Sequence, residues 1–245
     1  MPNIKAVLEY DGTGFFGFQR QPSKPTVQGE IERALSTIFR VDKFKIAAAG
    51  RTDAGVHATG QVISFQCPDR FPADRIRPAA NGLLPKSIRL RRTEVVPDEF
   101  HARYSAKSRT YIYVVLNRET PTAILARYVW HVMRPLDVDA MRCAAEPLVG
   151  THDFASFGMP DRAGGATVRR IRRLWIRPRK DAIYFGITAD AFLRGMARAI
   201  VGVLVETGIG KRSPDEVAEI LSARDRRVCG ACAPPRGLFL TRIEY

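Results

Sequence analysis

Hydrophobic and polar positions follow two different periods in the first hundred residues. Residues 4–10 alternate with a period of two and predict a strand ended by Asp11-Gly12. Residues 26–39 place apolar side chains on one face of a 3.6-residue period and predict a helix, preceded by Pro25. The remaining predicted elements of this half are strands at 44–49, 61–66 and 88–96, and a short helix at 74–81 closed by Gly82.

The second half repeats this mixture of strands and helices. Residues 168–178 and 182–188 predict a hairpin, and 191–207 predict the longest helix. The other predicted elements are strands at 110–116 and 238–243, a helix at 138–148, and a helix opened by Ser213-Pro214-Asp215-Glu216. Strands joined mainly as hairpins, with helices in both halves, favour an α+β fold over a parallel doubly wound sheet.

A polar stretch without a clear period, residues 100–107, separates the two halves. The predicted domains are therefore an N-terminal α+β half, 1–104, and a C-terminal α+β half, 105–245. A chain of 245 residues is long enough for one large domain or two modest ones.

The charge of the chain indicates a polyanionic partner. Lys and Arg number 39 against 25 Asp and Glu, a formal net charge of +14. Between Arg162 and Lys180 there are many cations and no acid. Nucleic acid is the simplest partner for such a chain, and a protein that is merely basic is the alternative.

Several features predict a cytoplasmic protein with no membrane segment. No apolar run approaches the ~20 residues needed to cross a bilayer. Residues 1–5 lead into the first strand without a signal-peptide layout. Four scattered cysteines do not form a disulfide framework at this length, which favours a reducing compartment.

Two patterns match cofactor or metal sites only in part. Residues 12–17 fit the spacing of a dinucleotide fingerprint, but prolines at 22 and 25 keep the chain extended where the fingerprint requires a helix. Cys229 and Cys232 make half of a zinc ligand set, and the other two cysteines stand alone. We therefore expect neither a nucleotide cofactor nor a metal.

The segment Gly50-Arg51-Thr52-Asp53-Ala54-Gly55-Val56-His57 carries the strongest chemical signal. It places one carboxylate, Asp53, between two glycines, which let a large partner approach the main chain. A lone acid facing a polyanion is poorly suited to binding and well suited to chemistry. From residue type alone, a turn-forming aspartate is the alternative.

Blocks spread from end to end of the chain resemble the tRNA pseudouridine synthase A family. Besides residues 50–57, they are Tyr10-Asp11-Gly12-Thr13, Gly17-Phe18-Gln19, Thr26-Val27-Gln28-Gly29, Asn81-Gly82-Leu83-Leu84-Pro85, Phe100-His101-Ala102-Arg103-Tyr104, Arg109-Thr110-Tyr111-Ile112-Tyr113, His152-Asp153-Phe154-Ala155-Ser156-Phe157, Thr167-Val168-Arg169, Phe192-Leu193 with Met196-Ala197-Arg198, and Ala233-Pro234-Pro235-Arg236-Gly237-Leu238. One block is weak, whereas the whole series in order is highly specific.

The resemblance implies a fold and a reaction. The implied fold has two ferredoxin-like α+β halves with mainly antiparallel sheets, joined around a central catalytic cleft. The implied reaction is conversion of uridines 38, 39 and 40 in the anticodon stem-loop of tRNA to pseudouridine by a cytoplasmic homodimer. This chemistry cuts a glycosidic bond and rejoins the uracil through carbon, so it requires no cofactor.

The resemblance also assigns roles to residues. Asp53 matches the catalytic carboxylate, and Tyr111 matches a tyrosine that stacks on the target base or relays the C5 proton. Arg198 matches the cation that pairs with the catalytic acid, and Leu238 an apolar pocket residue. Arg51 either braces the gap left by a flipped base or contacts phosphate.

Two other functions remain open from the residues. A glycosidase or nucleosidase usually needs a second carboxylate near the first, and none stands out around Asp53. A non-catalytic RNA-binding protein would use the basic stretch at 169–180 and would not need Asp53. Only part of that stretch can contact one RNA if it is a strand, because alternate side chains face opposite ways.

Overall fold

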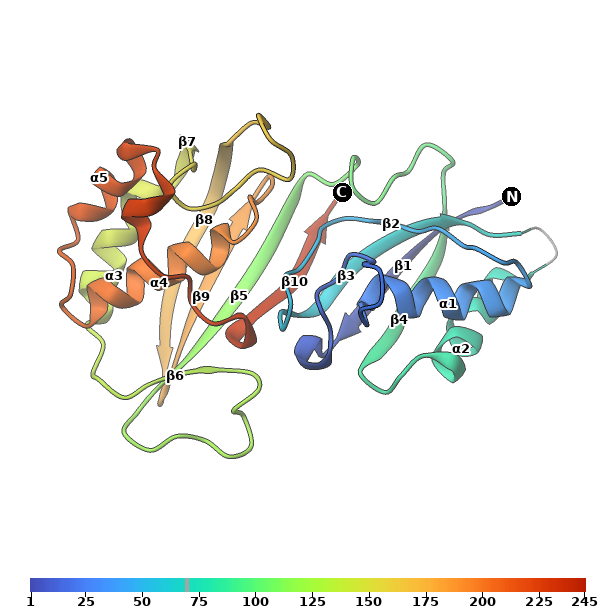
Figure 1. The fold of residues 1–245 in the computed structure, drawn as a ribbon, viewed down its shortest axis with the longest axis horizontal. Helices are drawn as coiled ribbons and strands as arrows, with labels where there is room; N and C mark the ends of the chain where they lie inside the picture. Colours follow the sequence, from blue (N-terminus) through green and yellow to red (C-terminus); the bar gives the residue numbers. More distant parts are fainter. Residues whose placement is uncertain (69–70) are drawn as a thin grey trace. The chain divides into compact units, whose positions relative to one another are not determined.

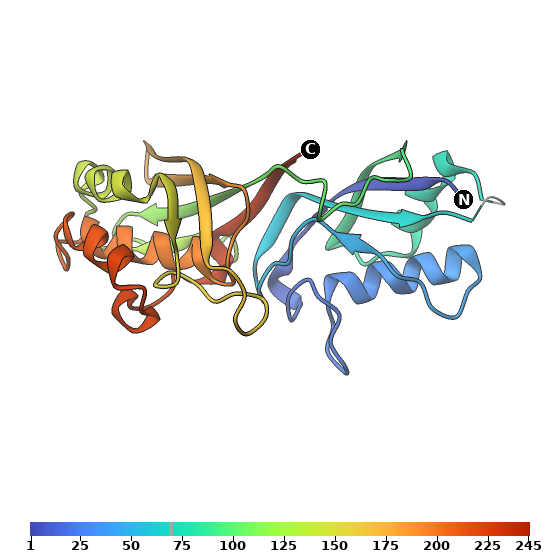
Figure 2. The same ribbon diagram turned by 90° about the horizontal axis from the view of Figure 1, so that it is seen from above.

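The computed structural model describes residues 1–68 and 71–245, which form two compact units. The first unit comprises Met1–Lys107 and Leu240–Tyr245, and the second comprises Ser108–Phe239. In Figures 1 and 2 each unit consists of helices packed on a sheet. The predicted domains divide the chain after Tyr104, whereas the structural division follows Lys107 and returns residues 240–245 to the first unit.

The sheet of the first unit is built around β1 (Asn3–Tyr10). This strand pairs antiparallel with β3 (His57–Gln66) on one side and with β4 (Ile88–Val96) on the other. Its residues Ile4, Ala6 and Leu8 are buried, which is the inward face that the period of two predicts. Two further strands lie beside β3, namely β2 (Ala47–Ala48) and the part of β10 (Leu238–Glu244) that belongs to this unit.

Helix α1 (Val27–Phe39) follows the predicted range closely. Thr26 caps it, since the Thr26 hydroxyl accepts a bond from the Gly29 N–H at 3.3 Å. Its face with Ile31 and Leu35 is buried. Helix α2 (Ala73–Leu83) lies beside it (Figure 1).

The second unit contains an antiparallel sheet in the order β5, β9, β8, β7. These strands are β5 (Ser108–Asn117), β9 (Ala182–Ala189), β8 (Val168–Arg179) and β7 (Gly150–Asp153), and β6 (Trp130–Val132) pairs parallel with β5. The helices are α3 (Val138–Ala145), α4 (Met196–Gly208) and α5 (Glu216–Ala223). Single 3₁₀ turns lie at Gly12–Gly14, Glu146–Leu148, Arg226–Cys229 and Pro235–Gly237.

The α+β class with mainly antiparallel pairing is confirmed. Most of α4 is buried, and α3 packs against both α4 and β8. Within the described residues, no helix has the length and apolar character to cross a membrane.

Several predicted elements have the wrong bounds. The strand predicted from residue 61 begins at His57, and the helix predicted to end at residue 148 ends at Ala145, where a 3₁₀ turn follows. The strand predicted at 44–49 is reduced to Ala47–Ala48. The helix predicted from residue 191 begins at Met196, because the Arg194 N–H and carbonyl pair with Met159 at 2.9 and 3.2 Å instead of with helical neighbours. The last helix begins at Glu216, and the Ser213 N–H bonds the Glu216 carboxylate at 2.8 Å.

The predicted end of α2 is also wrong. Gly82 lies inside the helix, which continues to Leu83. Leu84 is extended, with φ −73° and ψ 146°, because Pro85 follows it and a residue before proline disfavours helical angles. The short strands β6 and β7 have no clear signal in the sequence.

Candidate active site

Asp53 lies in the loop between β2 and β3 of the first unit. Its side chain is half-buried, and its neighbours Arg51 and Ala54 are exposed. The carboxylate is therefore not sealed inside the hydrophobic interior. Val56 closes the loop by donating its N–H to the Asp53 carbonyl at 3.1 Å, so residues 53–56 form a turn and not a helix.

Two side chains from the sheet hold this loop. The Tyr10 hydroxyl lies 2.8 Å from Thr52 Oγ1, and the Gln61 amide donates to the Gly50 carbonyl at 2.9 Å. Burial raises the pKa of Tyr10 above its ordinary value, so its hydroxyl stays protonated at neutral pH. The part of the loop that precedes Asp53 is thus bonded to β1 and β3.

The segment that follows the first 3₁₀ turn braces the loop from another side. Phe18 is buried and donates its N–H to the Thr52 carbonyl at 3.0 Å. Gly17 has φ +92°, and a Cβ there would lie 2.9 Å from the Thr52 carbonyl oxygen. Only glycine fits both the backbone angle and the close approach at this position.

His57 fixes the end of the loop. It is 1% exposed, and the Gly12 N–H donates to its Nδ1 at 3.1 Å. Helix α1 begins at Val27, well after the glycines at 12–17. A dinucleotide fingerprint needs a helix that begins among its glycines, so this late start agrees with the prediction that the motif does not bind a nucleotide. The glycine-rich segment therefore serves to position the Asp53 loop.

Arg198 lies in the first turn of α4 in the second unit. Its Nε donates to the Ala233 carbonyl at 2.7 Å, and the Ala233 N–H donates to the Arg198 carbonyl at 3.0 Å. The guanidinium is half-buried and is held against the 233–237 segment. It is a fixed side chain and not one more solvated helix charge.

Tyr113 holds the same segment from the sheet side, a role that the sequence analysis misses. Its hydroxyl donates to the Pro234 carbonyl at 2.7 Å, and its ring lies under Gly237, where a Cβ would be 2.6 Å from Cζ. Burial raises the pKa of Tyr113, so the hydroxyl remains a donor at neutral pH. The segment leads directly into Leu238, which is buried. The only signal in the sequence is the spacing of Tyr111 and Tyr113.

Tyr111 and Tyr113 share one face of β5, as predicted. Tyr111 is 7% exposed, and its ring meets that of Phe192 edge to face, with centroids 4.8 Å apart. Of the five predicted site residues, Asp53 and Arg51 belong to the first unit. The other three, Tyr111, Arg198 and Leu238, belong to the second.

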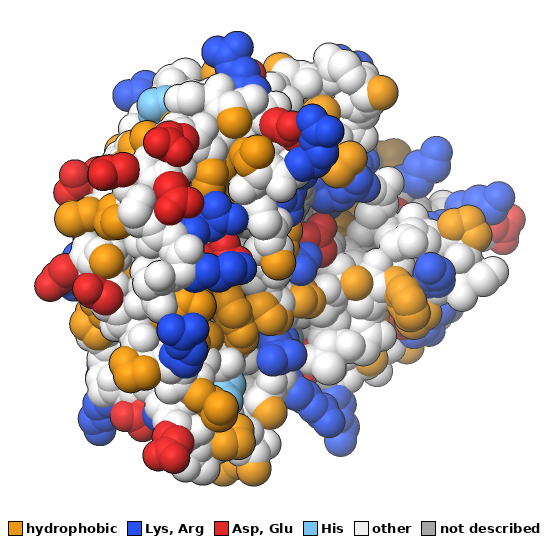
Figure 3. Space-filling model, turned by 60° about the vertical axis from the view of Figure 1, so that its left-hand side comes forward, with side chains coloured by type: hydrophobic (Ala, Val, Ile, Leu, Met, Phe, Trp, Pro, Cys, Tyr) orange, Lys and Arg blue, Asp and Glu red, His pale blue; other side chains and the backbone are white. Residues whose placement is uncertain are grey.

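The basic stretch of the second unit forms most of β8. Arg173, Trp175 and Arg177 lie opposite Thr188, Gly186 and Tyr184 of β9, so they share one face. The Arg177 guanidinium lies 5.0 Å from the Trp175 ring centroid. On the face of the molecule shown in Figure 3, several acidic side chains gather toward the left, and basic side chains are spread over the surface.

Cys229 and Cys232 lie in and just after the 3₁₀ turn that follows α5. Cys229 is buried, and burial raises the pKa of its thiol to about 11, which keeps it protonated and unreactive. Arg226 Nη2 lies 3.0 Å from Cys232 Sγ. Within residues 1–68 and 71–245, no three His, Cys, Asp or Glu side chains are gathered as metal ligands.

Comparison with known proteins finds similarity along the whole chain. The family model described as tRNA pseudouridine synthase matches residues 6–105 and 144–245. The chain is 39% identical to tRNA pseudouridine synthase A 2 of Clostridium perfringens over 245 residues, covering 100% of both chains. It is 44% identical to tRNA pseudouridine synthase A of Halalkalibacterium halodurans over 242 residues, covering 99% of this chain and 92% of the relative.

One solved structure shows a weaker similarity. A chain in the crystal structure of a Cbf5-Nop10-Gar1 complex is 11% identical with a TM-score of 0.36, and the match covers 82% of this chain and 45% of that chain. This chain thus spans less than half the length of that one, and the match is too weak to bear on function. The family model and the full-length relatives carry the assignment. The chain belongs to the tRNA pseudouridine synthase family, whose members are isomerases.

Proposed function

We propose that the protein converts uridines 38, 39 and 40 of the tRNA anticodon stem-loop to pseudouridine, with Asp53 as the nucleophile. The positions follow from the resemblance to the tRNA pseudouridine synthase A family. The observation that carries the role of Asp53 is its setting. The residues just before it are bonded to Tyr10 of β1, Gln61 of β3 and the Phe18 N–H, and the residue itself is only half-buried. A preorganised charge of this kind stabilises a transition state without reorganising.

The proposed reaction begins at the anomeric carbon of the target uridine. The Asp53 carboxylate attacks C1′, the N1–C1′ bond breaks, and its electron pair leaves with the uracil. The uracil turns, and its C5 bonds C1′ as the bond between C1′ and Asp53 breaks and frees the carboxylate. The C5 proton is then lost, and N1 takes up a proton. A glycal intermediate would use the same carboxylate. The target must first leave its stack, at a cost of a few kcal/mol.

Three residues of the second unit have proposed roles in this reaction. Arg198 is the cation that pairs with the Asp53 carboxylate and orients it. The Tyr111 ring stacks on the uracil or its hydroxyl relays the C5 proton, and Leu238 lines the base pocket. The bonds from Ala233 and Tyr113 support these roles, because they hold Arg198 and the segment before Leu238 in one arrangement.

Arg51 and the arginines of β8 are proposed to act on the RNA. Arg51 is exposed beside Asp53, a suitable place to fill the gap left by a flipped base. Phosphate contacts from the exposed β8 arginines would position the RNA without reading its sequence. We also propose, on the family resemblance, that the protein works in the cytoplasm as a homodimer with tRNA as its partner.

The first prediction concerns chemistry in tRNA labelled with tritium at uridine C5. The wild-type protein should release the label, and Asp53→Asn should reduce release by at least about a thousandfold because the nucleophile is lost. Arg198→Lys and Tyr111→Phe should lower kcat. The affinity for tRNA should stay close to that of the wild type in all three variants.

Matched controls separate the proposed roles. Arg194→Lys, in an exposed position before α4, should leave release unchanged. If Arg51 assists base flipping, Arg51→Ala should slow label release from a paired uridine more than from an unpaired one. If Arg51 contacts phosphate, the substitution should weaken the binding of both RNAs to the same extent. Label release by Asp53→Asn at the wild-type rate would refute the assignment of Asp53 as the nucleophile. No release by the wild type from any tRNA would favour a binding protein.

The second prediction concerns Gly17. Gly17→Ala should cost about 1–3 kcal/mol of stability and lower kcat by roughly tenfold or more, because the added Cβ meets the Thr52 carbonyl beside Asp53. Gly14→Ala is the control, since nothing lies within 4 Å of its Cβ position. Thermal unfolding and single-turnover tritium release measure both effects. Equal behaviour of the two variants would show that the close approach is unimportant.

The third prediction concerns assembly. Sedimentation equilibrium at micromolar concentration should give one species of twice the 27.3 kDa chain mass. A single species at the mass of one chain, over the concentrations at which the protein is active, would exclude a homodimer.

A further inference from the structure

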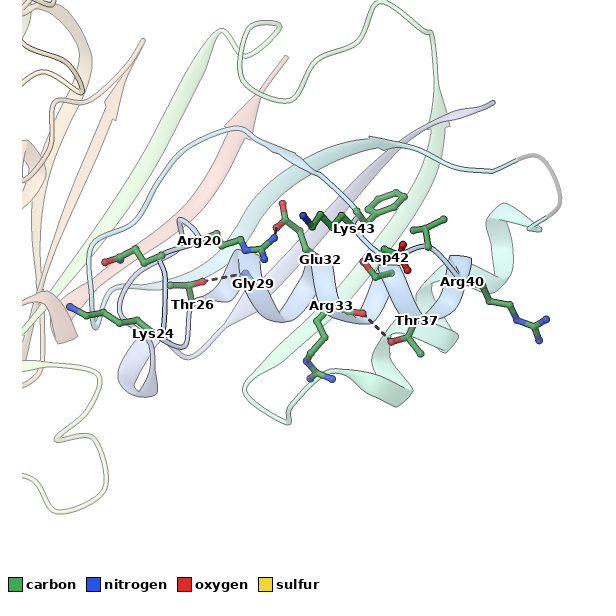
Figure 4. A pocket seen from close by; sticks show the side chains of 14 residues that line it. Arg20, Lys24, Thr26, Gly29, Glu32, Arg33, Thr37, Arg40, Asp42 and Lys43 are labelled. Atoms are coloured by element: carbon green, nitrogen blue, oxygen red, sulfur yellow. Dashed lines mark hydrogen bonds and ion pairs between the residues drawn. The ribbon is translucent and has the colours of Figure 1, made fainter.

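A groove of about 540 Å³ runs along helix α1 in the first unit. One wall is a stripe of α1 that carries Gly29, Arg33, Ser36 and Thr37 on one helical face, continued by Arg40, the residue that caps the C-terminal end of the helix. The other walls are the loop at 20–26 and the loop at 41–44. Figure 4 shows the side chains that line it.

A buried carboxylate ties these walls together. Glu32 is 5% exposed, and it accepts bonds from the Gln28 amide at 2.8 Å and the Ile46 N–H at 3.3 Å. Its other oxygen receives Arg20 Nη1 at 3.4 Å. The Glu32 carboxylate therefore points into the protein, where its hydrogen bonds hold the walls of the groove together.

The charges that face solvent in the groove are mainly positive. Five cations line it, namely Arg20, Lys24, Arg33, Arg40 and Lys43, and all five are exposed. Asp42 is the one exposed acid among the lining residues. Two of these cations are paired with acids, Arg20 with Glu32 at 3.4 Å and Arg33 with Glu30 at 2.6 Å. Among the described residues this leaves Lys24, Arg40 and Lys43 as the groove cations without an acidic partner. In Figure 4, the Lys43 side chain extends toward the end of the groove where Arg20 lies, whereas the Arg33 and Arg40 side chains point away from that end.

The groove is connected to the Asp53 loop within the same unit. The Gly17 carbonyl accepts the Val27 N–H at 3.2 Å, and the Phe18 carbonyl accepts the Gln28 N–H at 2.9 Å. The first turn of α1 is thus bonded to the segment that braces Asp53. From there the groove follows a helix of 13 residues, about 20 Å long.

We infer that this groove binds the phosphodiester backbone of the RNA beside the target uridine. The inference deepens the proposed function and rests on it. A polyanion matches the excess of exposed cations, and the Ser36 hydroxyl adds a donor for a phosphate oxygen. An open groove that follows one helix and is lined mainly by polar and charged residues suits a backbone better than a small buried ligand.

The test compares two triple variants with equal changes of charge. Arg33→Gln, Arg40→Gln and Lys43→Gln remove groove cations and leave Arg20 on Glu32. Arg75→Gln, Arg77→Gln and Lys86→Gln remove three exposed cations of the same unit that lie outside the groove. Affinity for full-length tRNA is measured at several salt concentrations, together with single-turnover tritium release at saturating enzyme.

The groove variant should bind tRNA at least about tenfold more weakly at 0.1 M salt, and its slope of log K against log[salt] should fall by about two to three. Its saturating rate should match that of the wild type, because backbone contacts act equally in ground and transition states. The control variant should change both affinity and slope much less.

Equal affinities and equal slopes in the two triple variants would overturn the inference. An acidic protein segment would then be the better candidate ligand for the groove. A groove variant that loses saturating rate but keeps its affinity would overturn it as well. A wild-type protein that binds tRNA but releases no label would refute the proposed function. The comparison of affinities would still decide whether the groove binds RNA.

Discussion

The Thr52 main chain and side chain are the point on which the candidate site depends. The Thr52 carbonyl receives the Phe18 N–H, and the Thr52 hydroxyl pairs with Tyr10, so the residue before Asp53 is bonded on two sides. Each of these hydrogen bonds contributes only about 1 kcal/mol to stability. Their larger effect is to fix the main chain that carries the carboxylate. A misplacement of a catalytic group by about 1 Å can lower the rate a hundredfold.

The second unit uses the same principle on different residues. Two hydrogen bonds join Arg198 and Ala233, and the Tyr113 hydroxyl donates a hydrogen bond to the Pro234 carbonyl. Tyr10 and Tyr113 are both buried phenols whose raised pKa keeps them as neutral partners. In both units, residues without a chemical role in the proposed reaction hold the residues that have one.

Much of this architecture could be predicted from the sequence where local and tertiary signals agree. The helix α1 has a cap, a clear apolar face and a good start signal, and its predicted bounds hold to one residue. Residues 191–195 have helical composition, but their main chain bonds Met159 instead, and a contact with a residue so distant in the chain leaves no local signal. The strand at 44–49 shrinks for the same kind of reason, since only Ala47 and Ala48 meet β3.

The surrounding motif in the sequence predicts a catalytic role for Asp53, but it does not show what holds the loop. The need for glycine at position 17 comes from a carbonyl 35 residues further on, and the role of Tyr113 from a proline over a hundred residues away. Such contacts exist only once the sheet has formed. The charged groove along α1 was missed because its cations come from three separate segments.

The most direct measurement is the single-turnover rate of tritium release by Asp53→Glu, alongside its affinity for tRNA. This substitution keeps the charge and moves the carboxylate outward by one methylene. If the loop exists to place that group, the rate should fall about a hundredfold or more with the affinity unchanged. A variant that releases label at the wild-type rate would contradict the account, because the position of the carboxylate would then be immaterial.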